Sequence, residues 1–472
     1  MGIQQKKISR NAYKKHFFPH LSWVKVALYL VAIAIYFIIV NSSMPSFSIP
    51  ARKAMAVFGV ASFLWMTNAL PLAVTGIVVL ILLPISHAVP ATEVYSYFGN
   101  PAIFFILGAF ILASPVMRSG LSVRIAVSII EVFGNTPFKL LFSVFWLSAC
   151  LCFVMSEHAV AAMLYPIIME IIDASELEKN SKFAFAIAVA MAWGAIIGGT
   201  ATLLGGARAP LAIGILKETG NSISFLQWTT YALPAVLIFL GIAFAVVCVV
   251  SRGTKVDIAK VHRQLKKHHK KLGKISKREI GICVVMLVTI ALWIVYGNDW
   301  GLDIIALMAV VAVFVLKLTN WKEVEQDVSW SIVLMYGSAI ALGTALRSTG
   351  AANALVDIIM NFGIQSSWLI FSMLIVLAAV LTEAMSNAAA VAVLMPVALV
   401  LASKYHINPQ IMTVALATSA GWTFMLSVST PSMAIISNCE YVPYNKLLAW
   451  GTVLKIVGIL VLLLVAKIYW GI

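Results

Sequence analysis

The sequence predicts an all-α polytopic membrane protein with about 11 transmembrane helices, and three observations carry this prediction. Of the 472 residues, 62% are hydrophobic and only 11% are charged, whereas charged residues make up about a quarter of an ordinary soluble domain. Apolar runs such as 232–250 and 453–468 are long enough to cross about 30 Å of hydrocarbon as helices. The second half of the chain also repeats motifs of the first half.

The distribution of positive charge gives the expected topology. The formal net charge is +15, and two short stretches, 6–25 and 252–278, hold more than half of the 33 Lys and Arg residues. Cytoplasmic loops collect Lys and Arg, so both stretches are expected on the cytoplasmic side, in contact with anionic lipid headgroups. Nucleic acid is not an expected partner, because no aromatic residue for base stacking interrupts the stretch 252–278.

The first half of the chain begins with a cytoplasmic segment, 1–22, and three helices at about 22–41, 53–68 and 70–89. A helix at 101–118 returns to the cytoplasm, and a short helix at 121–134 is expected at the membrane interface.

A re-entrant hairpin is predicted at 138–172. This apolar stretch carries Ser156-Glu157-His158 at its centre, and a straight spanning helix would place an acid and an imidazole in the hydrocarbon. A hairpin whose tip lies in a protein-lined cavity tolerates both side chains and a non-helical turn.

A broken helix is predicted at 183–217. Gly198-Gly199-Thr200 and Gly205-Gly206 are followed closely by Arg208 and Pro210, a pattern that favours an unwound segment over simple helix packing. A helix at 227–250 then reaches the basic stretch 251–279, which is predicted to link two halves in the cytoplasm.

The second half repeats this pattern at a separation that stays nearly constant along the chain. The matched motifs are Arg118-Ser119 with Arg347-Ser348, Phe133-Gly134 with Phe362-Gly363, and Met155-Ser156 with Met385-Ser386. Arg118 is expected on the cytoplasmic side and Arg347 outside, so the two repeats have inverted topology. Inverted repeats that each contain a re-entrant hairpin and a broken helix indicate a secondary transporter whose site lies near the membrane midplane.

Several motifs resemble those of the divalent anion/sodium symporter family, whose members carry dicarboxylates, citrate or sulfate. Residues 65–72 read Trp-Met-Thr-Asn-Ala-Leu-Pro-Leu, similar to a family signature that usually has Glu in place of Asn68. The tips Ser156-Glu157-His158 and Ser386-Asn387-Ala388 lie where the family has paired Ser-Asn-Thr motifs, and 424–431 resembles its second helix break. The resemblance covers most of the chain, from about position 55 to position 470.

The resemblance implies a homodimer whose protomers each have a scaffold domain and a transport domain that moves as an elevator. The scaffold would comprise 23–136, 227–250 and 280–364. The transport domain would comprise 137–226 and 365–445, and 446–472 would form the last transmembrane helix. The N-terminus would then be cytoplasmic and the C-terminus outside, in a plasma (inner) membrane.

The resemblance also implies site residues. Those expected at the substrate are Ser156, Glu157, His158, Arg208, Ser386, Asn387, Ala388, Thr430 and Pro431. Those expected to couple a cation or proton are Glu157, Gly199, Thr382, Ser386 and Asn387, with sodium possible at Thr382, Ser386 and Asn387. No other cofactor is expected.

The first half departs from the family at these positions, because Glu157, His158 and Cys152 stand where neutral oxygen ligands are usual. Arg208 would place a permanent positive charge at the first break, where it could do what bound sodium does; alternatively, it extends to the outer surface near Lys217. Glu157 beside an anion requires a pairing with Arg208 or His158, protonation, or a different substrate. Glu383 is expected to be a structural partner within the second hairpin.

The sequence therefore predicts a secondary active transporter of small organic anions, of the di- or tricarboxylate class, working by sodium-independent anion exchange or proton coupling. A sodium-coupled dicarboxylate or sulfate symporter is the alternative. A membrane-embedded enzyme is disfavoured, because the sequence has neither an HExxH motif nor a Gly-x-Ser-x-Gly motif.

Overall fold

The computed structural model describes residues 23–253 and 256–472, and every regular element within these ranges is a helix. The expected cytoplasmic segment 1–22 lies outside the described residues. The helices of the first half are α2 (Trp23–Asn41), α3 (Ile49–Thr67), α4 (Leu72–Ile85), α5 (Ala91–Ser96), η1 (Tyr97–Gly99), α6 (Pro101–Arg118), α7 (Leu121–Phe133), α8 (Pro137–Leu151), α9 (Glu157–Ala174), α10 (Lys182–Gly198), α11 (Arg208–Lys217) and α12 (Phe225–Val250).

The helix α13 (Ile258–Leu272) connects this half to the second half. The remaining helices are α14 (Lys277–Tyr296), α15 (Leu302–Val315), α16 (Trp321–Asp327), α17 (Trp330–Ser348), α18 (Ala351–Met360), α19 (Ser367–Ala384), α20 (Asn387–Lys404), α21 (Pro409–Gly421), α22 (Pro431–Ser437) and α23 (Tyr444–Ile468).

The predicted fold class is confirmed, and the repeat is visible in the order of the helices. The helices α3 to α9 have counterparts, in the same order, in α14 to α20, and the separation between matched first residues hardly changes. Eight helices in the described ranges are long and apolar enough to span a membrane. Two of these helices, α19 and α20, are the arms of the predicted second hairpin.

Two helix boundaries differ from the sequence prediction for local reasons. The second helix begins at Ile49 instead of residue 53, because Ser48 caps it and Pro50 fits its first turn. It ends at Thr67, where Asn68 adopts a left-handed conformation with φ of 48°. The third helix then begins only after Pro71.

The hairpins and broken helices pack on one another across the two halves. The hairpin α8–α9 packs on α10, and α19–α20 packs on α21. After each break the chain crosses over: α11 packs on α20 and α21, and α22 packs on α9 and α10. Residues from both repeats therefore meet at the two breaks.

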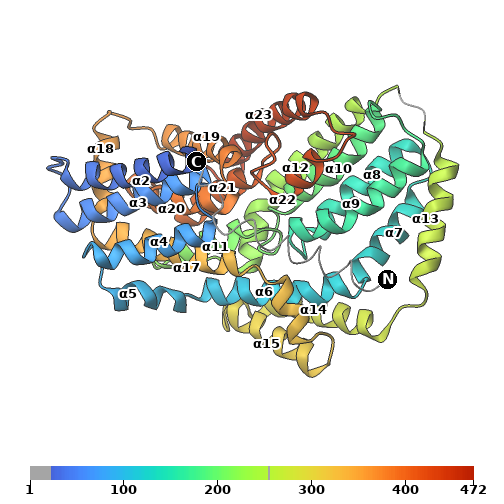
Figure 1. The fold of residues 1–472 in the computed structure, drawn as a ribbon, viewed down its shortest axis with the longest axis horizontal. Coiled ribbons are helices and arrows are strands. Elements are labelled where there is room, and N and C mark those ends of the chain that lie inside the picture. Colours follow the sequence, from blue (N-terminus) through green and yellow to red (C-terminus); the bar gives the residue numbers. More distant parts are fainter. Residues whose placement is uncertain (1–22, 254–255) are drawn as a thin grey trace, which may run out of the picture.

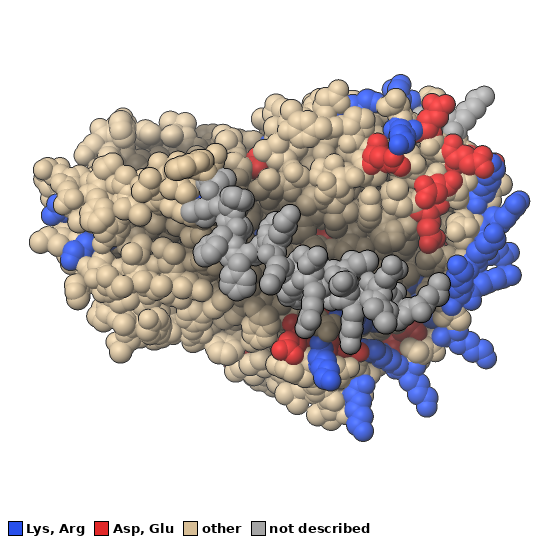
Figure 2. Space-filling view, in the orientation of Figure 1, with Lys and Arg blue, Asp and Glu red and all other residues tan. Residues whose placement is uncertain are grey.

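The basic stretch predicted to link the two halves contains an amphipathic helix, α13, which was not among the predicted helices. Asp257 caps its first turn, and Val261 and Leu265 are buried. It lies across one end of the molecule, and α5 and α18 lie at the opposite end (Figure 1). On the face shown in Figure 2, Lys and Arg side chains gather along the α13 end, whereas only a few appear at the opposite end.

Candidate functional site

Both hairpin tips and both helix breaks meet at a central cavity of about 420 Å³. One wall comes from the hairpins and breaks: Ser156, Glu157, His158, Ala159, Gly206, Ala207, Arg208, Ser386, Asn387, Ala388, Ser429 and Pro431. The other wall comes from α4, α6, α16 and α17, with Leu72, Phe110, Ala113, Met117, Asp327, Ser329, Ile332 and Met335. Residues from both halves of the chain thus form one site.

Three helix N-termini converge on this cavity. The helices α9, α11 and α20 begin at Glu157, Arg208 and Asn387, and all three residues line the cavity. Ser156 and Ser386 each accept a hydrogen bond from a backbone amide of the helix that follows. The remaining free amides and the helix dipoles make this a favourable place for an anion.

The tip of the first hairpin holds a buried pair of opposite charges. Arg208 Nη1 lies 3.4 Å from Glu157 Oε2, and the two residues are only 3% and 6% exposed. Arg208 therefore remains at the break and does not extend to the outer surface. Within residues 23–253 and 256–472, Glu157 Oε2 and Arg208 Nη2 have no hydrogen-bond partner, so both groups retain capacity to bind a ligand.

Glycines make the space that the Arg208 guanidinium occupies. A Cβ at Gly206 or at Gly421 would clash with guanidinium atoms, and one at Gly199 would lie 3.5 Å from Nη2. Gly421 ends α21 of the second half, so Arg208 lies between the two repeats. Gly421 was not among the predicted site residues, because nothing in its local pattern indicates a neighbour in the other half of the chain.

The second hairpin tip carries a cluster of oxygen atoms. Thr382 Oγ1 donates to the carbonyl of Ala420 at 2.7 Å and lies 2.8 Å from the side-chain amide of Asn387. With its nitrogen turned inward, that amide also donates to the carbonyls of Ala420 and Ser429, each at 3.2 Å. With its oxygen turned inward, the hydroxyl, the amide and the two carbonyls supply four oxygens, a donor set that suits sodium.

The remaining expected site residues divide into two groups. Ser156, His158, Ser386, Ala388 and Pro431 line the central cavity. Thr430 and Gly199 do not. The Thr430 hydroxyl instead caps α22 by accepting from the amide of Met433, and Gly199 packs closely against the backbone of Gly205.

Glu383 has a structural role, although its partners lie outside the hairpin. Its carboxylate accepts hydrogen bonds from the backbone amides of Phe424, Met425 and Leu426 at 3.2–3.3 Å. Lys455 of α23 lies 3.1 Å from the same carboxylate and donates to the carbonyl of Trp422. These contacts hold the unwound segment between α21 and α22 in place.

The opposite wall contributes an ion pair that sequence analysis missed. Arg118 of α6 donates to both carboxylate oxygens of Asp327, at 2.6 and 2.9 Å, and Ser114 donates to Asp327 Oδ2 at 2.6 Å. The hydrogen bond from Arg118 is the main reason that the pKa of Asp327 is lowered. Within the described residues, no cluster of His, Cys, Asp or Glu could hold a metal ion.

An all-helical membrane protein with paired hairpins and broken helices around a polar central cavity has the architecture of a transporter. A family model described as "Sodium:sulfate symporter transmembrane region" matches residues 20–472. The chain therefore belongs to the divalent anion/sodium symporter family, a family of membrane transporters and not of enzymes.

Individual proteins show more distant similarity. The chain is 27% identical over 429 residues to the sodium-dependent dicarboxylate transporter SdcS of Staphylococcus saprophyticus, covering 85% of this chain and 82% of that protein. It is 26% identical over 430 residues to SdcS of Staphylococcus aureus. The crystal structure of the YdaH transporter of Alcanivorax borkumensis has the same fold, with a TM-score of 0.54 and 14% identity over 96% of this chain and 99% of that one.

Proposed function

We propose that this protein is a secondary active transporter of small organic anions of the di- or tricarboxylate class, and that it exchanges anions without sodium or with protons. The observation that carries the proposal is the buried pair of Arg208 and Glu157 at the first hairpin tip, 3.4 Å apart. It introduces a permanent cation at a position where family members use bound sodium.

The substrate class rests on the chemistry of the cavity. Three helix N-termini, the Arg208 guanidinium and the Asn387 amide converge on its wall, and all of them favour an anion. The SdcS proteins, which share about a quarter of their residues with this chain, are dicarboxylate transporters. A substrate with two carboxylates can contact the groups of both tips at once.

The coupling rests on a comparison of the two halves. When the matched motifs are aligned, Glu157 corresponds to Asn387 and Cys152 to Thr382. The first half has thus replaced an amide and a hydroxyl by an acid and a thiol, which removes two oxygen ligands that suit sodium. Arg208 supplies a positive charge there that cannot dissociate.

A tethered charge favours exchange over net uptake. When Glu157 is protonated, the substrate-free protein would have to move the uncompensated charge of Arg208 through the membrane, which disfavours return of the empty carrier and favours exchange. With substrate bound, a substrate carboxylate takes the place of Glu157 at the guanidinium. Because Arg208 cannot leave with the substrate, it gains no energy from an ion gradient. Protonation of Glu157 would release Arg208 for the substrate, which is a route to proton coupling.

A sodium-coupled dicarboxylate or sulfate symporter is the second candidate, and the oxygen cluster of the second half favours it. Thr382, Asn387 and the carbonyls of Ala420 and Ser429 retain a donor set that suits sodium. In this case sodium would bind in the second half only, and Arg208 would serve the first half.

The proposal includes the membrane arrangement. The protein would be a homodimer in a plasma (inner) membrane, with a cytoplasmic N-terminus and an outer C-terminus. The hairpins and broken helices would move together as an elevator against the other helices. The basic side chains gathered at the α13 end support a cytoplasmic position for that end (Figure 2).

A thermal-shift screen of the purified protein tests the proposal. Succinate, citrate and sulfate are added in choline chloride or in sodium chloride, with the monocarboxylate butyrate as control. A ligand that binds the folded state raises Tm by mass action. We expect succinate or citrate to raise Tm in choline, and butyrate to have no effect. Stabilisation by sulfate alone, or only in sodium, would contradict the proposed substrate or coupling.

A further inference from the structure

A second cavity, of about 400 Å³, lies between α11, α17, α18 and α20. It shares no lining residue with the central cavity. Its polar wall includes Glu218, Thr344, Arg347, Asn353, Ser403 and Lys404. Its volume falls within the range of cavities that hold small organic ligands.

The internal repeat shows what the side chains of this cavity can bind. Arg118 and Arg347 are matched residues near the ends of α6 and α17. In the first half, the Arg118 guanidinium and the Ser114 hydroxyl together bind the carboxylate of Asp327 through three hydrogen bonds of 2.6–2.9 Å. One side of the molecule therefore contains a complete carboxylate-binding arrangement built from an arginine and a hydroxyl one helical turn apart.

The second half contains a related pair, Thr344 and Arg347, with no carboxylate bound to it among the described residues. The residue aligned with Ser114 is Gly343, so the hydroxyl is supplied from the next position along α17. Thr344 and Arg347 lie one helical turn apart on α17, which places them on one helix face. Thr344 is only 8% exposed, and its hydroxyl has no hydrogen-bond partner among the residues that the structure describes. Arg347 forms no ion pair or hydrogen bond within the described ranges. In the aligned repeats, the counterpart of Asp327 is Tyr97, whose hydroxyl donates to Glu93.

We infer that this cavity is a second anion site, in which Arg347 and Thr344 bind a carboxylate of a small organic acid as Arg118 and Ser114 bind Asp327. This ligand class follows from the Asp327 contacts and does not depend on the proposed function of the central cavity.

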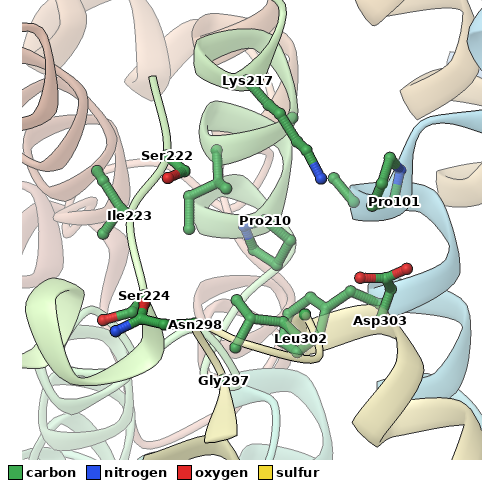
Figure 3. A pocket seen from close by; sticks show the side chains of 15 residues that line it. Pro101, Pro210, Lys217, Ser222, Ile223, Ser224, Gly297, Asn298, Leu302 and Asp303 are labelled. Atoms are coloured by element: carbon green, nitrogen blue, oxygen red, sulfur yellow. The ribbon is translucent and has the colours of Figure 1, made fainter. Parts of the chain in front are cut away.

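Two other charged side chains around the cavity have partners of their own. Glu218 accepts a hydrogen bond from the Asn100 side chain at 2.7 Å, and Lys404 lies 3.6 Å from Asp357. The neighbouring cavity of about 240 Å³, shown in Figure 3, offers a different environment, since Lys217 and Asp303 of opposite charge both line it. Lys217 is therefore a suitable control: an exposed cation on α11 that does not line the proposed site.

Equilibrium binding of radiolabelled succinate to the full-length protein in detergent tests the inference. We expect two classes of site in the wild-type protein. Arg347→Gln should weaken succinate binding at one of the two classes of site about tenfold or more, the usual effect of losing a charge-assisted hydrogen bond. Thr344→Val should weaken the same class. Lys217→Gln should leave both classes unchanged, and Asn387→Ala should affect only the central site.

A single class of site in the wild-type protein would overturn the inference, as would a second class that survives in Arg347→Gln or disappears equally in Lys217→Gln. The proposal for the central cavity and the inference of a second site can be contradicted independently of each other. Binding that depends on Arg347 but not on Asn387 would support the second site and contradict the central one, and the reverse pattern would contradict the second site alone.

Discussion

Gly421 is the residue whose substitution tests the position of Arg208 most specifically. A Cβ there would clash with the Arg208 guanidinium and approach the Thr200 side chain at 2.7 Å. We predict that Gly421→Ala displaces the guanidinium and weakens substrate binding at least tenfold, because a buried charged group would lose its fitted site. Binding is measured by isothermal titration with succinate.

Gly241 provides the matched control, because a Cβ at this position in α12 would meet nothing within 4 Å. Gly241→Ala should bind succinate like the wild-type protein. Equal affinity in both alanine variants would mean that the guanidinium does not contribute to binding from this position.

Glu157 gives the site an expected pH dependence. Protonation removes its negative charge and frees Arg208 for the substrate, so succinate exchange should rise as the pH falls. Between about pH 8 and pH 7 the substrate carboxyls stay ionised, which isolates the effect of the protein. Glu157→Gln should exchange at a rate that no longer changes with pH.

His158 also lines the cavity and is exposed there, so His158→Asn is measured alongside. If Glu157→Gln retains the pH dependence and His158→Asn abolishes it, the titrating group is the histidine, and the role assigned to Glu157 is wrong.

For individual residues, the sequence predicts which residue types occur at the site better than it predicts which residues contact one another. The pattern around Gly198 and Arg208 indicated a break carrying a cation. The pairing of Arg208 with Glu157 was one of several alternatives, because a sequence gives no distance between residues on two separate elements. Asp327 and Gly421 were missed since each is ordinary in its local sequence and gains importance only through contacts with another part of the chain.

Among the elements, α13 shows how composition can hide structure. Its many basic residues predicted a cytoplasmic linker but no helix, yet the Asp257 cap and the apolar residues Ile258, Val261 and Leu265 are spaced for an amphipathic helix. His268 and His269 contact Glu170 and Glu131 of α9 and α7, and Lys260 lies 2.7 Å from Glu176. Through these contacts, α13 connects the first hairpin to α7 at this end of the molecule.

Arg124 connects α7 to the end of α13 and the start of α14. It donates to Glu279 Oε1 at 2.7 Å and to the carbonyls of Gly273 and Leu272 at 2.8 and 2.9 Å. Arg124→Gln should increase amide hydrogen exchange in 258–276 about tenfold or more, because charge-assisted hydrogen bonds that hold this segment are lost.

Lys266→Gln is the control for this prediction, since Lys266 is an exposed cation on the same helix and its substitution should leave exchange unchanged. Protection that is the same in both variants would show that Arg124 does not stabilise α13.

At the scale of the whole molecule, the repeat was the most informative feature of the sequence, because motif matches at one separation fix the order of many helices at once. The same repeat makes the differences between the halves interpretable. Under the proposed function, Glu157 and Arg208 would replace sodium chemistry in the first half, and Thr382 and Asn387 would retain it in the second. How the two halves cross over at the breaks was not predictable, because it depends on packing between α11 and α21.

The proposed inverted topology can be tested by cysteine labelling in a background without native cysteines. Arg263→Cys and Lys271→Cys on α13 should react with a membrane-impermeant maleimide only from the cytoplasmic side. Asn298→Cys, in the exposed loop between α14 and α15, should react only from outside. Labelling of the two α13 positions from outside would overturn the proposed orientation.

The most direct test of the central claim, that the tethered Arg208 replaces sodium in the first half, is counterflow of radiolabelled succinate into proteoliposomes that contain unlabelled succinate and choline as the only monovalent cation. We predict rapid uptake without sodium, a large decrease when internal succinate is omitted, and loss of uptake in Arg208→Gln. Uptake that requires sodium and is indifferent to internal succinate would contradict the claim.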